Sequence, residues 1–239
     1  MLGRFLEQSI ATPDIRASLD FYGRLGFWAA QVGEAWSHPY AVVTDGRICL
    51  GLHQSSTFES SLTFVKSGLL KLIDQLAPLA VEFEFRRLAN DTFNEIGWPD
   101  PSGHLIRVVE ARTFSPAARR GLNPSLCGSF TEIALPAPAP APAKDHWERL
   151  GFVGLDEPDA LLPHISCTSD SINVGLYDPA LVREVTLMFE VEDFDALPTR
   201  LETAGIARGV GNPASLRTAR SVLLTAPEGT ALLMSAPAD

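Results

Sequence analysis

The sequence predicts an α+β fold made of two similar halves in tandem. One octapeptide occurs twice, as Asp-Phe-Tyr-Gly-Arg-Leu-Gly-Phe at 20–27 and as Asp-His-Trp-Glu-Arg-Leu-Gly-Phe at 145–152. Arg24 of the first copy corresponds to Arg149 of the second, an offset of 125 residues in a chain of 239. Each copy follows a short apolar strand and precedes further strands, so each half begins with the order strand, helix, strands. Two domains of ordinary size account for this length.

The first half divides into two units of this kind. Phe5–Ala11 predicts a strand, and Asp14 can cap a helix over Ile15–Leu25 that Gly26 closes in the left-handed conformation. Further strands are expected at 27–32, 35–43, 47–53, 61–65, 81–87 and 105–110, a second helix at 68–79, and turns at 45–46 and 98–103.

The second half repeats the plan with one alteration. Strands are expected at 130–135, 162–167, 172–177, 184–191, 222–225 and 231–235, and a helix at 194–204. Proline and alanine alternate over 136–142, which favours extended polyproline geometry, so the helix that matches 15–25 is expected only over Lys144–Leu150. Residues 113–128 contain proline and glycine and are expected to link a first domain at 1–112 to a second at 129–239.

Composition and charge restrict the partners and the compartment. The formal net charge is −10, which disfavours nucleic acid and anionic membrane surfaces as partners. No apolar run approaches the roughly 20 residues of a membrane span, and the N-terminus lacks the apolar core of a secretory signal. The three cysteines include no Cys-x-x-Cys and are expected to be reduced thiols. We therefore expect a cytoplasmic protein.

Four motifs in this order resemble the vicinal oxygen chelate superfamily, which includes glyoxalase I, the bleomycin and fosfomycin resistance proteins and the extradiol dioxygenases. The motifs are Ile-Ala-Thr-Pro-Asp at 10–14, the repeated helix end with Leu-Gly-Phe, Asp-Pro-Ser-Gly-His-Leu-Ile at 100–106, and Phe-Glu-Val-Glu-Asp at 189–193. The resemblance implies two tandem glyoxalase-like domains. Each would consist of two βαβββ units that form a curved mixed sheet enclosing a cavity.

Enzymes of this superfamily hold a divalent metal on the first, fourth, fifth and eighth strands of a domain. The resemblance places at these positions Glu7, Gly51, Ser61 and Arg107 in the first half, and Glu132, Gly175, Thr186 and Leu233 in the second. A metal site needs three or four converging donors, whereas each half keeps one carboxylate. Arg107 adds a fixed positive charge. We therefore expect no metal and no cofactor.

Alternation along the strands places Glu7, Ser9, His53, Ser61, Thr63 and Arg107 on the inward face of the first half. The residues expected to contact a ligand are Glu7, His53, Ser61, Thr63 and Arg107 from this face, with Trp36, Tyr40 and Trp98 as aromatic walls. The superfamily geometry would bring Glu7 and Arg107 together. They would form either a buried ion pair that replaces the metal or a site where Arg107 binds an anionic or carbonyl-bearing ligand. Glu7 and His53 are the candidates for acid–base catalysis. A structural role for His53, and packing for the aromatic residues, are the alternatives.

These observations favour a metal-independent small-molecule-binding protein of the glyoxalase and bleomycin-resistance type, with its ligand in the first-domain cavity. The alternative is an enzyme: a lyase, isomerase or ring-cleaving dioxygenase that uses a displaced metal or an acid–base pair. A third possibility is an interaction module with a closed cavity. Because two domains are already fused, we expect a monomer with an internal pseudo-dimer, with a loose homodimer as the alternative.

Overall fold

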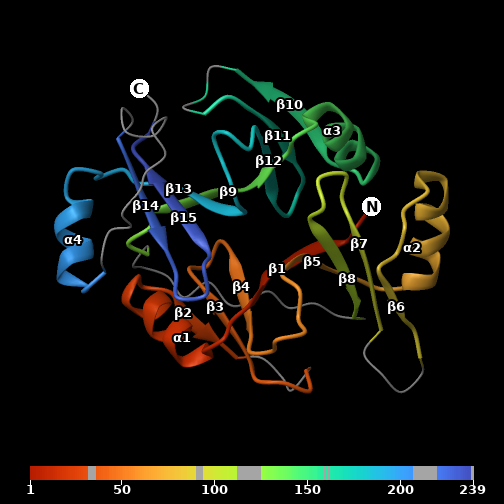
Figure 1. Ribbon diagram of the computed structural model, residues 1–239, viewed down its shortest axis with the longest axis horizontal. Helices are drawn as coiled ribbons and strands as arrows, with labels where there is room; N and C mark the ends of the chain where they lie inside the picture. Colours follow the sequence, from red (N-terminus) through yellow and green to blue (C-terminus); the bar gives the residue numbers. More distant parts are fainter. Residues whose placement is uncertain are drawn as a thin grey trace.

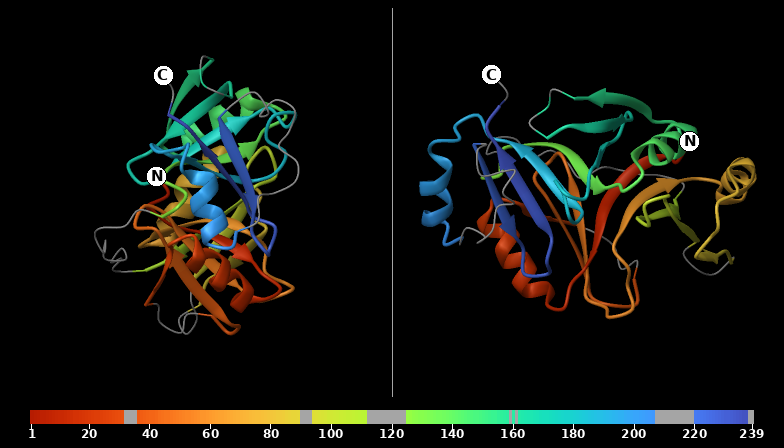
Figure 2. Two further views of the ribbon diagram at one scale, coloured as in Figure 1. Left: turned by 90° about the vertical axis from the view of Figure 1, so that its left-hand side faces the viewer. Right: turned by 45° about the horizontal axis from the view of Figure 1, so that its top comes forward.

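The computed structural model describes residues 1–31, 36–89, 94–111, 125–158, 160, 162–206 and 220–237. Within these ranges the chain forms two mixed β-sheets, with helices at the outside of the molecule (Figure 1). Two further views show the sheets side by side, one from each half of the chain (Figure 2). The predicted α+β class with two tandem glyoxalase-like domains is confirmed. None of the described helices has the length and apolar character needed to cross a membrane.

The first sheet has the strand order β2-β3-β4-β1-β5-β8-β7-β6. Its first unit consists of β1 (Arg4–Ala11), α1 (Ile15–Arg24), β2 (Trp28–Ala30), β3 (Tyr40–Thr44) and β4 (Cys49–His53). Its second unit consists of β5 (Ser61–Lys66), α2 (Leu69–Leu76) with a 3-10 turn at Ala77–Leu79, β6 (Phe85–Arg87), β7 (Glu95–Pro99) and β8 (Leu105–Glu110). Antiparallel pairing of β1 with β5 joins the two βαβββ units into one open sheet.

The second sheet has the order β10-β11-β12-β9-β13-β15-β14 within the described residues. One unit consists of β9 (Ser129–Pro136), α3 (Pro140–Arg149), β10 (Val153–Glu157), β11 (His164–Thr168) and β12 (Asn173–Tyr177). The other contains β13 (Thr186–Glu190), α4 (Leu197–Thr203), β14 (Ser221–Thr225) and β15 (Ala231–Ser235). Antiparallel pairing of β9 with β13 repeats the central pairing of the first sheet.

Helix α3 corrects one prediction. It begins at Pro140, inside the proline–alanine tract, and not at Lys144. The first four N–H groups of a helix have no partner within it, so Pro140 and Pro142 remove no helical hydrogen bond. Residues 113–124, which make up most of the expected linker at 113–128, lie outside the described residues.

The repeated octapeptide joins the two domains. Its final residues, Phe27 and Phe152, follow left-handed glycines and occupy equivalent positions. The Phe27 ring packs edge-on against Phe189 at 6.5 Å, and the Phe152 ring packs edge-on against Phe64 at 6.4 Å, each partner lying in the other domain. Phe64 and Phe189 are themselves equivalent, being 125 residues apart. The domains therefore share one buried hydrophobic core across a pseudo-twofold relationship.

Candidate functional site

Glu7 occupies the first-strand metal position and is surrounded by protein donors. Its side chain is only 2% exposed. Ser9 Oγ donates to Oε1 at 2.8 Å, Tyr40 OH donates to Oε2 at 2.5 Å, and His53 Nε2 lies 3.4 Å from Oε1. A Cβ on Gly51, at the fourth-strand position, would lie 2.0 Å from Glu7 Oε1. The Glu7 carboxylate thus fills the space that a side chain on β4 would otherwise take.

Arg107 occupies the eighth-strand position on β8 and is 4% exposed. Its Nη1 forms a buried ion pair with Glu95 of β7, and its Nε donates to Ser61 Oγ at 3.2 Å. Arg87 of β6 pairs with the other oxygen of Glu95. The expected ion pair between Glu7 and Arg107 is therefore wrong, because Glu95 supplies the counter-charge.

Three hydroxyl groups connect the two charged residues. Ser9 Oγ lies 2.8 Å from Thr63 Oγ1, which lies 3.1 Å from Ser61 Oγ. A continuous hydrogen-bonded chain therefore runs from Glu7 to Arg107 across β1, β5 and β8. We call this group, with Tyr40, His53 and Glu95, the first-domain polar cluster. Ser9 was expected on the inward face but not as a ligand contact, and Glu95 had not been predicted as a member of a site.

Aromatic rings cover the polar cluster. The Phe58 ring stacks on His53 with centroids 3.7 Å apart and planes inclined by 7°. The guanidinium carbon of Arg107 lies 4.7 Å from the centre of the same Phe58 ring, 4.6 Å from that of Phe85 and 5.8 Å from that of Trp36. One side chain, Phe58, therefore contacts both the imidazole and the guanidinium.

Of the predicted ligand-binding residues, the structure brings seven together: Glu7, Trp36, Tyr40, His53, Ser61, Thr63 and Arg107. Trp98 lies apart from them, fully buried in the hydrophobic core, with its ring edge-on to Phe83 at 6.0 Å. On β7 the register pairs Gly97 with Arg107 and Trp98 with Ile106. Alternation along the strand therefore turns Trp98 to the face opposite Arg107.

The surroundings of His53 make its imidazole harder to protonate. Burial lowers the pKa of His53, and this effect outweighs the hydrogen bond and the charge of Glu7, which raise it. His38 Nε2 lies 2.9 Å from His53 Nδ1, so one imidazole donates a hydrogen bond to the other. Burial and the charge of Glu7 raise the pKa of Tyr40, so its hydroxyl stays protonated and donates to Glu7.

The second domain contains a similar carboxylate with its partners exchanged. Tyr177 OH donates to Glu132 Oε1, and His164 Nε2 lies 3.4 Å from the same oxygen. The His164 and Tyr177 rings are stacked, 4.4 Å apart. In the first domain β3 carries the tyrosine and β4 the histidine, whereas β11 carries the histidine and β12 the tyrosine. The other three metal positions hold Gly175, Thr186 and Leu233, and none of them supplies a charge.

The donor set does not fit a divalent metal in either domain. Among the described residues, no three or more His, Cys, Asp or Glu side chains are grouped as a metal site would require. Both oxygens of Glu7 already accept hydrogen bonds, so an ion there would compete with Tyr40 and Ser9. At these positions Glu7 is held by Tyr40 and Ser9, and Arg107 is held by Glu95 and Ser61.

Several solved structures share this architecture. One is catechol 2,3-dioxygenase, with a TM-score of 0.63 and 14% identity over 99% of this chain and 88% of that one. The chain has the vicinal oxygen chelate fold. The 2,3-dioxygenase LapB from Pseudomonas sp. KL28 shares the fold with a TM-score of 0.64 and 15% identity over 100% of this chain and 94% of that one. The Mn(II)-bound glyoxalase from Novosphingobium aromaticivorans also matches, with a TM-score of 0.64 and 15% identity over 98% of this chain and 82% of that one.

No family model and no curated protein matches the sequence. The similarity therefore lies in the vicinal oxygen chelate fold, and the side chains of the site decide what this chain does with it.

Proposed function

We propose that this chain is a metal-independent small-molecule-binding protein of the glyoxalase and bleomycin-resistance type. Its ligand would be a flat aromatic molecule, bound at the first-domain polar cluster in the place that Phe58 now takes. The observation that supports this most directly is the stacking of Phe58 on His53, with Arg107 beside the same ring. These contacts are the ones that an aromatic ligand would make.

The surroundings of Phe58 match the requirements of an aromatic site. The imidazole of His53 offers a flat face, Trp36 an aromatic wall and Arg107 a cation beside the ring. A carbonyl or carboxylate on the ligand could accept hydrogen bonds from the guanidinium. Phe58 lies between β4 and β5, outside any regular element, so its loop can be displaced without breaking a sheet.

Shortening the Phe58 side chain tests this proposal. In Phe58→Ala, benzoate and phenol should bind the space left by the ring, with an affinity at least about tenfold higher than for the unmodified chain. Calorimetric titration measures the affinities, and circular dichroism checks the fold. Phe83→Ala is the matched control, because Phe83 is also half-buried but packs on Trp98 away from the polar cluster. A folded Phe58→Ala variant that binds neither probe would contradict the proposal.

An enzymatic role is the second candidate, and the Glu7–His53 contact favours it. The two side chains are buried and 3.4 Å apart, and a neutral imidazole can act as a base. In this case Glu7→Gln should abolish turnover of a substrate while leaving its binding intact. A ligand that binds without being converted would instead support the binding protein.

A further inference from the structure

A pocket of about 520 Å³ lies between the two domains, and Phe58 is not among the residues that line it. Its wall includes Gln8 of β1 and the start of β5 from the first domain, and residues 184–185 and 228–230 from the second. Ser61 is the one member of the first-domain polar cluster on this wall. A volume of this size is typical of pockets for small molecules.

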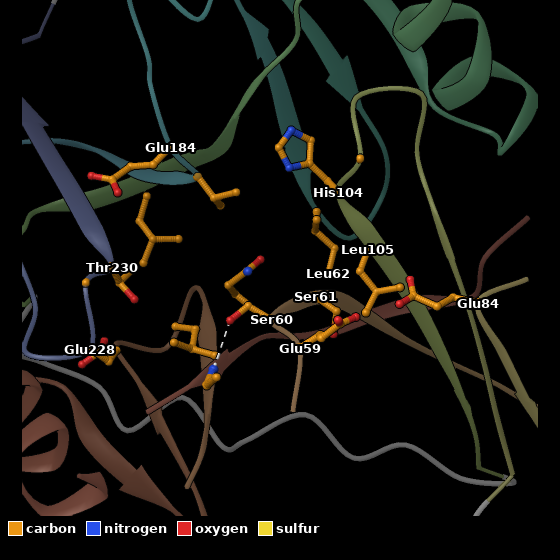
Figure 3. A pocket seen from close by; sticks show the side chains of 17 residues that line it. Glu59, Ser60, Ser61, Leu62, Glu84, His104, Leu105, Glu184, Glu228 and Thr230 are labelled. Atoms are coloured by element: carbon orange, nitrogen blue, oxygen red, sulfur yellow. Dashed lines mark hydrogen bonds between the residues drawn. The ribbon is translucent and has the colours of Figure 1, made fainter. Parts of the chain in front are cut away.

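The pocket is strongly acidic. Four carboxylates line it, those of Glu59, Glu84, Glu184 and Glu228, and no lysine or arginine is among its described lining residues. Glu184 and Glu228 lie on one side and Glu59 and Glu84 on the opposite side (Figure 3). The pocket therefore presents negative charge from two directions.

One of these charges is fixed in place. Tyr22 OH donates to Glu228 Oε1 at 2.6 Å, and Ser18 Oγ donates to Oε2 at 2.7 Å. Both donors belong to α1 of the first domain, so the Glu228 carboxylate is held across the domain junction. On the opposite side, the hydrogen bond that protonated Glu84 donates to Glu59, followed by burial and the charge of Glu59, raises the pKa of Glu84. A bound cation would relieve the repulsion between these two residues.

Gln8 supplies an independent sign of a ligand. Its side chain lines the pocket and is only 4% exposed, yet its Oε1 has no hydrogen-bond partner among the described residues. A buried acceptor without a donor is unfavourable, and most such groups in folded proteins are paired. A ligand with an N–H donor would pair it.

We propose that this interdomain pocket binds a small organic cation with more than one protonated amine, such as an aliphatic diamine. One ammonium group would donate to Gln8 Oε1, and the chain would span the carboxylates on the two sides. A single metal ion fits less well, because among the described residues no three acidic or other ligating side chains are close enough to hold one. His104 Nε2 is already within 2.8 Å of the Pro136 carbonyl oxygen.

Titration calorimetry of the intact chain with 1,4-diaminobutane tests the site, with Mg²⁺ at matched ionic strength as the comparison. We expect saturable diamine binding that Mg²⁺ does not displace. Gln8→Leu should weaken it at least about tenfold, because the acceptor is lost while the shape is nearly kept. Glu82→Gln removes one charge from an exposed residue outside the pocket and should leave the affinity unchanged.

Three results would overturn the site: no saturable binding, equal displacement by Mg²⁺, or unchanged affinity in Gln8→Leu. Should circular dichroism show that Gln8→Leu is unfolded, Glu184→Gln takes its place under the same criterion, since Glu184 is an exposed lining residue. The inference does not depend on the Phe58 site, and Phe58→Ala should bind diamine as the unmodified chain does.

Discussion

Tyr40 donates a hydrogen bond to Glu7 at 2.5 Å, and the equivalent carboxylate of the second domain, Glu132, accepts the same bond from Tyr177. The two tyrosines come from non-equivalent strands. Each half therefore contains a buried carboxylate in contact with a tyrosine and a histidine. The strand that carries the tyrosine in one half carries the histidine in the other. Both halves therefore hold the first-strand acid with hydrogen-bonding side chains of the protein itself.

Removing the Tyr40 hydroxyl should leave the buried Glu7 carboxylate with one hydrogen-bond donor fewer. Tyr40→Phe is expected to lower the free energy of unfolding by about 1–3 kcal/mol. Urea denaturation of Tyr40→Phe, Glu7→Gln and the double variant forms a double-mutant cycle. We expect a coupling energy of about 0.5–3 kcal/mol, as found for residues in one network. Strictly additive effects would show that the contact contributes nothing.

Glycine at position 51 should be required because the Glu7 carboxylate lies against it. Gly51→Ala would place a Cβ 2.0 Å from Oε1, and the carboxylate could move only by breaking its hydrogen bonds. We expect a loss of about 1–3 kcal/mol of stability. Gly23→Ala is the matched control, since nothing lies within 4 Å of its added Cβ in α1. That change should stabilise by about 0.5–1 kcal/mol. Equal denaturation midpoints for the two variants would refute this role of Gly51.

Removing one charge of the buried Glu95–Arg107 pair should destabilise the fold more than replacing both residues. Glu95→Gln leaves Arg107 buried without its counter-charge, and we expect a loss of about 3–5 kcal/mol. Replacing both residues, in Glu95→Leu with Arg107→Met, should recover most of it, because apolar side chains of similar volume carry no desolvation penalty. Thermal and urea unfolding compare the variants. A double variant as unstable as the single one would mean that the charges have another function.

The pKa values of His53 and His164, the two histidines that contact a buried carboxylate, should be shifted in opposite directions from the ordinary value of 6.5. Burial lowers the pKa of His53 despite Glu7. Burial also acts to lower that of His164, but the hydrogen bond and charge of Glu132 and the Leu162 carbonyl together raise it. The stabilising contribution of His164 is therefore present below pH 6.5 and is lost as the pH rises through its folded value. The stability linked to neutral His53 is present above 6.5 and is lost as the pH falls through its folded value.

Imidazole resonances followed by NMR between about pH 4 and 9 check this difference, because an unperturbed histidine titrates near the middle of that interval. His53→Gln and His164→Gln assign the two signals. We expect the His164 midpoint above 6.5 and the His53 midpoint below it. The reverse order would show that burial does not dominate at His53.

The sequence was sufficient for the architecture but not for the partners within the site. The repeated octapeptide and the strand order predict both sheets, because hydrophobic periodicity and left-handed glycines are local signals. Strands β7 and β10 were missed, and the short run of β7 at 95–99 begins with an acid and ends at a proline. Glu95 lies on β7 and was therefore missed too, so Glu7 was expected to be the partner of Arg107. Phe58 gave no signal either, because a single aromatic residue in a polar loop shows neither period nor direction.

Metal content tests metal independence most directly. The intact chain would be expressed with iron, manganese and zinc in the medium, purified without chelator and analysed by mass spectrometry for bound metals, with Glu7→Gln prepared in parallel. We predict no stoichiometric metal in either sample. An ion present at one per chain in the unmodified protein and absent from Glu7→Gln would contradict the proposal.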